Sequence, residues 1–257
     1  MAKRKETVRI YRQEPLAGDI FSLTIETSMA EEAHAGQFLG VYIKDASRLL
    51  ARPISICDAD AARGLIRMVY RISGEGTREL SSYREGKTLE ILGVLGNGYD
   101  IGVTKGKRTI VIGGGIGIPP MLLAAKSIPG EKEIVLGYAD AQTFLREEFE
   151  KEAKVYIATM DGSVGTKGTV IDAMNANQVE GDVIFACGPM PMLRAVKQYA
   201  AAHQMEAYLS LEERMACGVG ACLGCVCRTV KKDKHTNVNN ARICTEGPVF
   251  DAREVEI

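Results

Sequence analysis

The feature that most constrains this chain is a group of five cysteines near its C-terminal end. Four of them fall within the stretch ACGVGACLGCVC, and the fifth follows at Cys244. The first three have the spacing C-x4-C-x2-C, and a distant fourth cysteine completes the usual ligand set of a plant-type 2Fe–2S centre. Interleaved glycines suit such a loop, because it must turn its N–H groups toward the cluster sulfurs. The predicted ligands are Cys217, Cys222, Cys225 and Cys244.

Two alternatives to this ligand set remain open. Structural zinc usually pairs its cysteines as two C-x2–4-C units, whereas Cys244 stands alone. Cys227 lies two residues after Cys225 and could replace it as a ligand, unless its side chain points outward. Cys57 and Cys187 stand apart, in surroundings typical of small core residues. Because five of the seven cysteines follow residue 216, a disulfide scaffold is not indicated.

Composition narrows the function classes. The net charge of −1 creates no broad basic field, which argues against nucleic acid as a partner. No run of 18 apolar residues occurs, so we expect no membrane span. The basic start MAKRKETVRI lacks the apolar stretch of a signal peptide, and a cytoplasmic protein is expected.

Strand and turn patterns predict a multidomain β plus α/β protein. Residues 1–103 read as short strands separated by turn signals, with one short helix near 77–83, which predicts an antiparallel β-barrel or a β-sandwich. Residues 104–211 alternate strands with helices, one of them at 141–151, which predicts a doubly wound parallel sheet. Residues 212–257 show little periodicity and need something other than a core, such as a metal cluster, to hold them.

A glycine-rich turn points to a nicotinamide site in the second domain. The sequence GGGIGIPP at 113–120 follows an apolar strand and opens a helix, where N–H groups can bind a pyrophosphate. A plain strand–helix connection would also use such glycines. A second turn of this kind, Cys187-Gly188-Pro189, follows the strand at 182–186. Asp140 closes another strand, where an acidic side chain favours the ribose hydroxyls of NAD over the 2′-phosphate of NADP. A solvated loop carboxylate would also fit at this position. The remaining candidates here are Gly113, Gly114, Gly115 and Gly117.

Three short motifs in the first domain suggest a flavin site. They are Arg52-Pro53-Ile54-Ser55, Val69-Tyr70-Arg71 and GEGT, which ends in Gly76-Thr77. A guanidinium supplies paired donors to phosphate oxygens, and the start of a helix adds N–H groups. Each motif by itself is ordinary for strands and turns.

The order of all these motifs is more specific than any one of them. Taken together, RPIS, GEGT, ILGVLGNGY, GGGIGIPP, MDGSVGTKG, ACGP and MACGVGACLGC resemble the ferredoxin–NADP reductase superfamily, in which a flavin-binding barrel precedes a nicotinamide-binding domain. Within it, the set is similar to the electron-transfer subunits of dihydroorotate dehydrogenase B, over essentially the full length. The resemblance implies FAD, a 2Fe–2S cluster and NAD(H) as co-substrate.

The resemblance also implies roles for the flavin motifs. It places the Ser55 hydroxyl near the reactive edge of the flavin and lets Gly76 and Thr77 cradle phosphate. Two departures are visible. Many superfamily members carry an aromatic residue at Ile54, so a flavin-stacking contact is either absent or supplied by Tyr70, and the stretch KKDKHTNVNN before Cys244 is longer than expected.

In the resembling family, a partner subunit carries FMN and oxidises dihydroorotate to orotate in pyrimidine biosynthesis. Electrons then pass through the cluster and FAD to NAD⁺, in a heterotetramer of two such chains and two catalytic subunits. No acid–base pair is conspicuous in this sequence, and His34, His203 and His235 read as surface residues rather than catalysts. We therefore expect no substrate-oxidising site in this chain.

Two rival functions remain open. The same fold could serve an NAD(P)H:ferredoxin oxidoreductase or a sulfhydrogenase-type complex. Some of those relatives place an aspartate where Cys217 stands, which favours the dihydroorotate interpretation here. A rival of another class is a zinc-stabilised, non-catalytic regulatory subunit.

Overall fold

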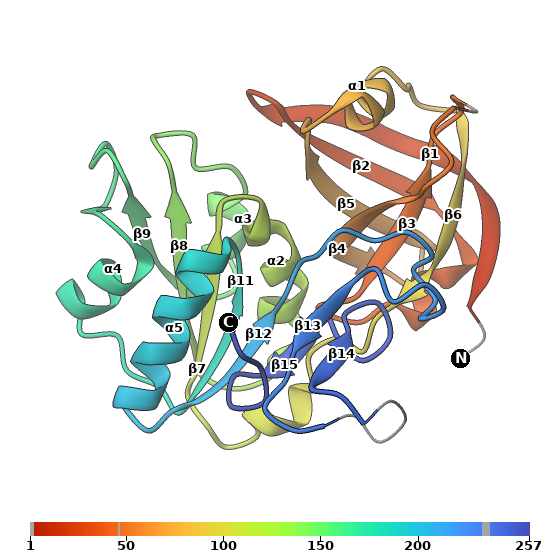
Figure 1. The fold of residues 1–257 in the computed structure, drawn as a ribbon. Coiled ribbons are helices and arrows are strands. Elements are labelled where there is room, and N and C mark those ends of the chain that lie inside the picture. Colours follow the sequence, from red (N-terminus) through yellow and green to blue (C-terminus); the bar gives the residue numbers. More distant parts are fainter. Residues whose placement is uncertain (1–2, 46, 233–236) are drawn as a thin grey trace.

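The computed structural model describes residues 3–45, 47–232 and 237–257. His235 and part of the stretch 231–240 therefore lie outside the described residues. Six strands form a closed barrel in the order β1-β2-β5-β4-β3-β6, with every neighbouring pair antiparallel, which confirms the predicted barrel (Figure 1). These strands are β1 (Arg4–Ala17), β2 (Ile20–Glu26), β3 (Phe38–Tyr42), β4 (Arg52–Asp60), β5 (Leu65–Arg71) and β6 (Thr88–Leu95).

Alternating side chains fill the barrel. Val8 and Ile10 on β1 are buried while their neighbours are exposed, as expected for strands with one face toward a core. Helix α1 (Glu75–Ser81) lies over one end of the barrel (Figure 1), where the Gln13 amide donates to the carbonyls of Leu80 (2.8 Å) and Tyr83 (3.0 Å). One short 3₁₀ helix, η1 (Ser28–Glu32), follows β2.

The second half of the chain forms a seven-stranded sheet in the order β10-β9-β8-β7-β11-β12-β15. All neighbours are parallel except β12 and β15. From β7 the chain builds outward to β8 and β9, then returns to place β11 on the other side of β7, so the order reverses between β7 and β11. Open α/β sheets bind their ligands outside the carboxyl ends of the strands at such a reversal.

The strands of this sheet are β7 (Thr109–Gly114), β8 (Lys132–Tyr138), β9 (Lys154–Thr159), β10 (Thr166–Lys167), β11 (Val183–Cys187), β12 (Glu206–Ser210) and β15 (Val249–Asp251). Its helices are α2 (Ile118–Ser127), α3 (Arg146–Phe149), α4 (Val170–Ala176) and α5 (Met190–Ala202), with 3₁₀ turns η2 (Ile101–Thr104) and η3 (Gly115–Gly117). The doubly wound architecture agrees with the alternation in the sequence.

One predicted helix is much shorter than expected. The helix expected at 141–151 is reduced to α3, which has four residues. The Asp140 carboxylate accepts the N–H of Gln142 (2.8 Å), which favours a turn, and Leu145 has a φ of 64°, outside helical geometry. The local backbone therefore interrupts a stretch whose composition suits a helix.

The C-terminal segment is joined to both domains. It forms a small sheet of β13 (Val226–Arg228) and β14 (Asn240–Arg242), and its last strand, β15, extends the edge of the α/β sheet. The Asn97 amide, just after β6 of the barrel, donates to the carbonyls of Val249 (2.8 Å) and Glu246 (3.0 Å). Figure 1 shows this segment lying where the barrel and the α/β domain meet.

Direct contacts also fix the barrel against the α/β domain. The Tyr99 ring stacks on Phe185 of β11 at 4.6 Å, and its hydroxyl donates to the carbonyl of Ala186 (2.9 Å). Arg67 of β5 forms a partly buried ion pair with Glu148 of α3 (2.6 Å). These contacts hold the end of β11 and helix α3 against the barrel side of the molecule.

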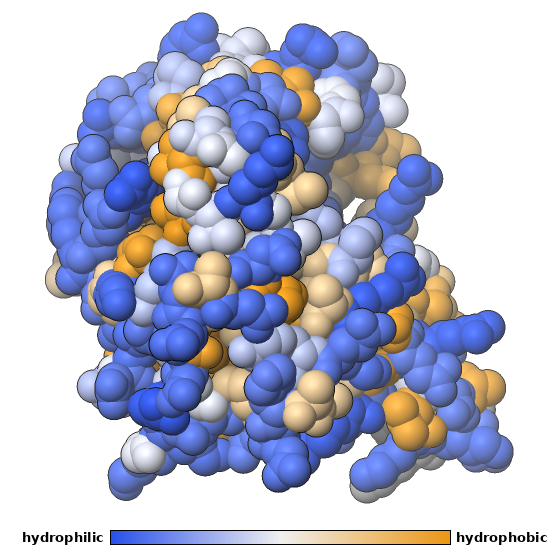
Figure 2. Space-filling model, turned by 90° about the vertical axis from the view of Figure 1, so that its left-hand side faces the viewer, coloured by the Kyte–Doolittle hydropathy of each residue, from blue (hydrophilic) through white to orange (hydrophobic). Residues whose placement is uncertain are grey.

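The outer surface of the α/β domain is largely hydrophilic in the view of Figure 2, and its apolar groups form separate strips rather than one broad patch. Among the described residues, no helix combines the length and hydropathy needed to cross a membrane.

Candidate cofactor-binding site

Strands β4 and β5 stop pairing at the end of the barrel that carries the first two flavin motifs. Strands β4 and β5 pair from Asp60 and Leu65 only as far as Ile56 and Met68. Beyond that point, in the part of the chain that the structure describes, residues 52–55 pair with β3 and residues 69–71 pair with β2. The two segments therefore present main-chain edges to each other without a ladder between them. Such a gap offers N–H and C=O groups to a flat, polar-edged ring system like a flavin.

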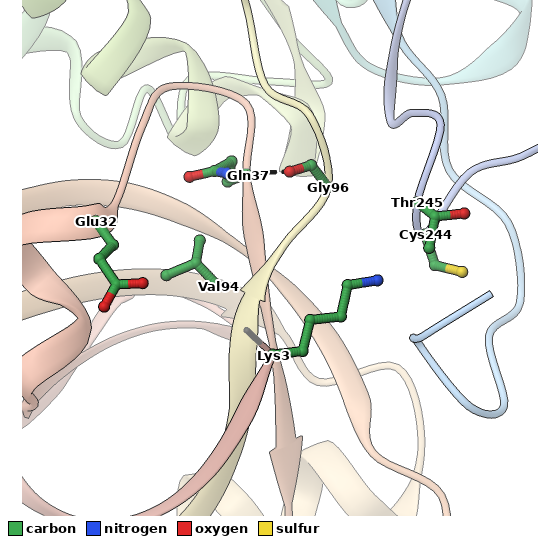
Figure 3. Close-up of a pocket in the computed structure, with 7 residues that line it drawn as sticks. All are labelled: Lys3, Glu32, Gln37, Val94, Gly96, Cys244 and Thr245. Atoms are coloured by element: carbon green, nitrogen blue, oxygen red, sulfur yellow. Dashed lines mark hydrogen bonds between the residues drawn. The ribbon is translucent and has the colours of Figure 1, made fainter. Parts of the chain in front are cut away.

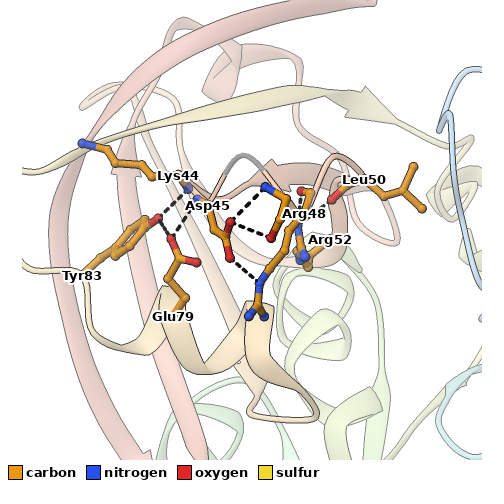
Figure 4. A network of polar contacts seen from close by, with 8 residues as sticks. Lys44, Asp45, Arg48, Leu50, Arg52, Glu79 and Tyr83 are labelled. Carbon is orange, nitrogen blue, oxygen red and sulfur yellow. Dashed lines mark hydrogen bonds and ion pairs between the residues drawn. The ribbon is translucent and has the colours of Figure 1, made fainter.

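Arg52 lies against the start of α1. A Cβ atom added to Gly76 would lie 2.4 Å from the Arg52 Nε, so only glycine allows this approach. The guanidinium donates to the carbonyls of Leu50 (2.6 Å) and Arg48 (3.2 Å), in the network of Figure 4. In the same network, Asp45 accepts hydrogen bonds from Ser47 and Arg48, which lower the pKa of its carboxyl to about 2. Arg52 thus joins residues 48–50 to the helix.

The first turn of α1 has main-chain donors to offer. The first N–H groups of a helix have no partner inside it. The Thr77 hydroxyl is already used in the cap, since it accepts from the N–H groups of Ser73 (2.9 Å) and Gly74 (3.2 Å). Gly76 and Thr77 can therefore serve an anion through their main-chain N–H groups, beside the Arg52 guanidinium.

Several predicted flavin residues have buried side chains. Ile54, Val69 and Tyr70 are between 3% and 6% exposed. The Tyr70 hydroxyl donates to Gln13 (3.3 Å) and its ring lies 6.0 Å from that of Phe21, while burial raises its pKa. These side chains are committed to the barrel core. Pro53 and Arg71 are exposed, Ser55 is half-buried, and Arg71 pairs with Asp19 (3.5 Å).

The two predicted nicotinamide turns meet at the point where the sheet order reverses. Gly113 and Cys187 are partners in the register of β7 and β11. A Cβ atom on Gly117 would lie 2.5 Å from the carbonyl carbon and oxygen of Cys187, and 2.6 Å from the Gly188 Cα. The turns are therefore in van der Waals contact through their backbones, and nothing larger than glycine fits at position 117.

Other features of these turns suit an extended phosphate ligand. Gly115 has a φ of 53°, and an added Cβ atom there would point into open space. Pro189 caps the start of α5. Asp140 follows β8, the neighbour of β7, so its carboxylate lies at the same carboxyl edge of the sheet. Burial raises the pKa of Cys187 to about 12, which keeps this thiol neutral.

The nicotinamide turns face the gap in the barrel. Turn η3 contacts β5, and α2 packs along β4, the two strands that separate there. The same relation is visible in Figure 1, where α2 lies between the sheet and the barrel. A ring bound in the barrel gap and a ring bound over the glycine turns would therefore be neighbours.

Four cysteines come together in the C-terminal segment as two interacting pairs. The Cys217 sulfur interacts with the Cys222 thiol, and the Cys244 sulfur interacts with the Cys225 thiol. Among the described residues, no three His, Cys, Asp or Glu side chains are grouped as a single ion requires. Two pairs of cysteines suit a centre with two irons, each of which takes two cysteines.

The loop also supplies donors to its sulfurs. The N–H groups of Val219 and Gly224 approach the sulfurs of Cys217 and Cys222, both at 3.4 Å. Burial raises the pKa of Cys217, but hydrogen bonds from neighbouring N–H groups outweigh this effect and lower the pKa to about 6. A thiolate is the form that binds iron. The donor set and its surroundings therefore fit an iron–sulfur cluster.

Cys227 has different surroundings from Cys225. Cys225 is 3% exposed and interacts with Cys244. Cys227 lies on β13 opposite Ala241, packs against the hydrophobic core, and has a pKa raised to about 11 by burial. Its side chain thus points inward, rather than outward as one argument from the sequence supposed.

The structure adds features that the motifs did not contain. The unpaired edges of β4 and β5 and the contact of Tyr99 with β11 both depend on distant parts of the chain. The stretch ILGVLGNGY, which includes Tyr99, was the only signal for that contact. His34 and His203 are exposed, as the sequence suggested.

Comparison with known proteins identifies the family. Residues 212–256 match the family model described as the iron–sulfur cluster binding domain of dihydroorotate dehydrogenase B. The electron transfer subunit of dihydroorotate dehydrogenase B (NAD(+)) from Geobacillus sp. (strain WCH70) is 40% identical, and the match covers 98% of each chain. The subunit of the same name from Fusobacterium nucleatum is also 40% identical, over 94% of this chain and 95% of its own length.

Solved structures agree with this result. A structure reported for flavin-based electron bifurcation in an NADH-dependent reduced ferredoxin-NADP oxidoreductase is 27% identical, with a TM-score of 0.85, over 97% of this chain and 89% of the other. The ferredoxin reductase of carbazole 1,9a-dioxygenase shares the fold, with a TM-score of 0.69 over 80% of this chain and 67% of its own. Its sequence is 17% identical. From sequence and structure together, this chain belongs to the electron-transfer subunits of dihydroorotate dehydrogenase B.

Proposed function

We propose that this chain carries electrons from an FMN-containing dihydroorotate dehydrogenase subunit to NAD⁺, in the step of pyrimidine biosynthesis that makes orotate. The family is that of oxidoreductase subunits with FAD, a 2Fe–2S cluster and NAD as cofactors. The observation that carries the proposal is the placement of the paired glycine turns opposite the barrel gap, with the paired cysteines on a segment joined to both domains. We assign residues 1–103, 104–211 and 212–257 to FAD, NAD and the cluster.

The barrel residues would hold FAD in the gap between β4 and β5. When bound, FAD exchanges two electrons with a nicotinamide and single electrons with an iron–sulfur cluster. Main-chain groups of Pro53, Ile54, Val69 and Tyr70 line the gap, because the side chains of the last three are buried. The Ser55 hydroxyl would lie near the reactive edge of the flavin, as the resemblance implies. The phosphate partners are Arg52, Arg71, Gly76 and Thr77.

The sheet residues would hold the nicotinamide nucleotide. Gly115 and Gly117 would present their N–H groups to the pyrophosphate at the start of α2, while Gly113 and Gly114 at the end of β7 carry no side chain that would block its approach. Cys187, Gly188 and Pro189 form the facing wall of the crevice. The Asp140 carboxylate accepts hydrogen bonds from ribose hydroxyls and would repel the 2′-phosphate of NADP.

The cluster segment would face the catalytic partner. Cys217, Cys222, Cys225 and Cys244 hold the cluster. Apolar side chains around it are exposed, including Val219 (41%) and Leu223 (54%), with Val226, Val230 and Val238 nearby in sequence. Exposed apolar groups of this kind are typical of protein interfaces. We propose a heterotetramer of two such chains and two FMN-containing catalytic subunits.

One solved structure favours a second route for the electrons, through a partner linked to ferredoxin. The solved structure with a TM-score of 0.85 belongs to an oxidoreductase that uses reduced ferredoxin and NADP. That fold similarity extends over nearly the whole chain, so a partner linked to ferredoxin could use the same cofactor sites. The 40% identity to dihydroorotate dehydrogenase subunits over full length favours the dihydroorotate route.

The test uses the complex as it is isolated without oxygen. Dihydroorotate should drive the reduction of NAD⁺, and Cys222→Ser should abolish NADH formation while NADH still bleaches the flavin. Absorbance at the NADH and flavin bands follows both reactions. If the wild type bleaches with NADH but dihydroorotate yields no NADH, the cofactor sites stand and the dihydroorotate partner is wrong.

Gly76→Ala should weaken FAD binding about 10- to 100-fold. Its Cβ atom would displace the Arg52 guanidinium, and a hydrogen bond to a charged group contributes about 1.5–3 kcal/mol. Binding is measured by the quenching of flavin fluorescence on deflavinated protein.

Gly74→Ala is the matched control for that variant. A Cβ atom on Gly74 would meet nothing within 4 Å, and the Gly74 N–H is already bonded to Thr77. This variant should bind FAD as the wild type does. Equal affinities for both alanine variants would contradict the phosphate role of Arg52 and Gly76.

A further inference from the structure

Two buried side-chain hydroxyls in the described parts of the chain lack a hydrogen-bond partner, those of Thr109 and Thr245. Native proteins pair nearly all of their buried polar groups, so each exception calls for a physical account. Thr109 is the first residue of β7, at the end of the strands opposite the glycine turns. Thr245 directly follows Cys244, one of the four cysteines proposed to hold the cluster.

Thr245 shares a cavity with Cys244. The cavity has a volume of about 170 Å³ and lies between the barrel and the C-terminal segment. Its barrel side is formed by Lys3, Glu32, Gln37, Val94 and Gly96. Figure 3 shows the Cys244 sulfur and the Thr245 hydroxyl pointing to the same side, away from the barrel strand. The hydroxyl is therefore directed toward the cysteine segment.

The Thr245 side chain also touches the loop that carries the first cysteines. A Cβ atom added to Gly220 would lie 2.9 Å from the Thr245 Cγ2 and 3.3 Å from its Oγ1. Gly220 has a φ of 85°, and its N–H interacts with the Cys244 sulfur. The hydroxyl and this N–H thus lie in the same small region beside that sulfur. A threonine hydroxyl carries one proton to donate, and the residues that the structure describes offer it no acceptor.

We propose that the Thr245 hydroxyl donates a hydrogen bond to a sulfur of the 2Fe–2S cluster on the Cys244 side, and thereby raises the reduction potential of the cluster. This inference rests on the proposed cluster site. A one-electron reduction adds negative charge to the cluster, and a hydrogen-bond donor stabilises the more negative form more strongly. Thr245 is then a residue that tunes the cluster rather than one that holds it.

The test is a reduction titration of the complete complex without oxygen, followed by the electron paramagnetic resonance of the reduced cluster. Thr245→Val and Thr245→Ala both remove the donor, and both should shift the potential to more negative values. The expected change is about tenfold in the one-electron equilibrium, or about 59 mV. Thr245→Ser keeps the donor and should restore the wild-type potential.

Thr109→Val is the matched control, because it removes the other unpaired buried hydroxyl. It should leave the potential of the cluster unchanged. A second readout is independent of potential: in the wild type, a proton that exchanges with deuterated water should couple to the reduced cluster, and this coupling should weaken in Thr245→Val.

The outcomes separate this inference from the one on which it rests. A wild-type complex without any 2Fe–2S signal would overturn both the cluster site and the role of Thr245. A normal cluster whose potential is the same in wild type, Thr245→Val and Thr109→Val would overturn the role of Thr245 alone. Loss of the cluster from both Thr245→Val and Thr245→Ala, with retention in Thr245→Ser, would also contradict it, because the hydroxyl would then hold the cluster.

Discussion

Replacing Cys225 with alanine should yield a chain that binds FAD but holds no iron–sulfur cluster, whereas the same change at Cys227 should leave the cluster in place. Cys225 is almost fully buried and interacts with Cys244, so its loss would leave one iron with a single cysteine. Cys227 instead packs beside Ala241. Visible absorption and the resonance signal of the reduced protein measure the cluster content.

Activity should follow cluster content in these two variants. Without the cluster, dihydroorotate should no longer produce NADH, while NADH should still reduce the flavin, because the nicotinamide turns and the barrel gap are distant in sequence from Cys225. The Cys227→Ala chain should retain both reactions. A Cys227→Ala chain without cluster, beside a Cys225→Ala chain that keeps it, would reverse the assignment of the third ligand.

Gly117→Ala should disrupt the nicotinamide site and lower stability. Its Cβ atom would lie 2.5 Å from backbone atoms of Cys187, which cannot rotate away as a side chain can. Overpacking of this kind costs about 1–3 kcal/mol, or a fall of about 5 °C in the melting temperature. Separating the two turns should also weaken NADH binding by at least about tenfold, since a misplaced phosphate loses charge-assisted hydrogen bonds. NADH titration of flavin bleaching and thermal melts measure the two effects.

The control for this variant is another glycine of the same domain. A Cβ atom on Gly130 would lie 3.8 Å from its nearest neighbour, the carbonyl oxygen of Lys107, which is an ordinary contact. Gly130→Ala should therefore bind NADH and melt as the wild type does. If Gly117→Ala behaved in the same way, the two turns would not form one crevice.

Local chemistry explains what the sequence could predict. The cysteine spacing predicts an iron–sulfur ligand set, with only the choice between Cys225 and Cys227 and the rival of zinc left open, because cysteines and glycines at such intervals have few other uses. The alternation of apolar strands with helices defines the doubly wound sheet, since each element buries its own face. The glycine turns after β7 and β11 were visible because close backbone approach restricts the residue type.

Long-range features escaped the sequence for an equally physical reason. The pairing of β4 and β5 stops at Ile56 and Met68. Main-chain hydrogen bonds form whatever the side chains are, so the residue types do not show where the pairing ends. The helix expected at 141–151 shrinks because Leu145 adopts a left-handed conformation that composition does not reveal. The contact of the Thr245 side chain with Gly220 joins positions that lie 25 residues apart in the chain, which the local sequence does not reveal.

The place of β15 at the edge of the α/β sheet has a consequence for how the molecule is made. This strand, at residues 249–251, pairs with β12, while Asn97 ties the same strand to the barrel. During synthesis the barrel strands and β7 to β12 emerge before β15, so the contacts of β15 with β12 and Asn97 form after the rest of both domains has been made. The closing of this edge of the sheet is therefore a late step, whereas the contact of Tyr99 with Phe185 can form before it.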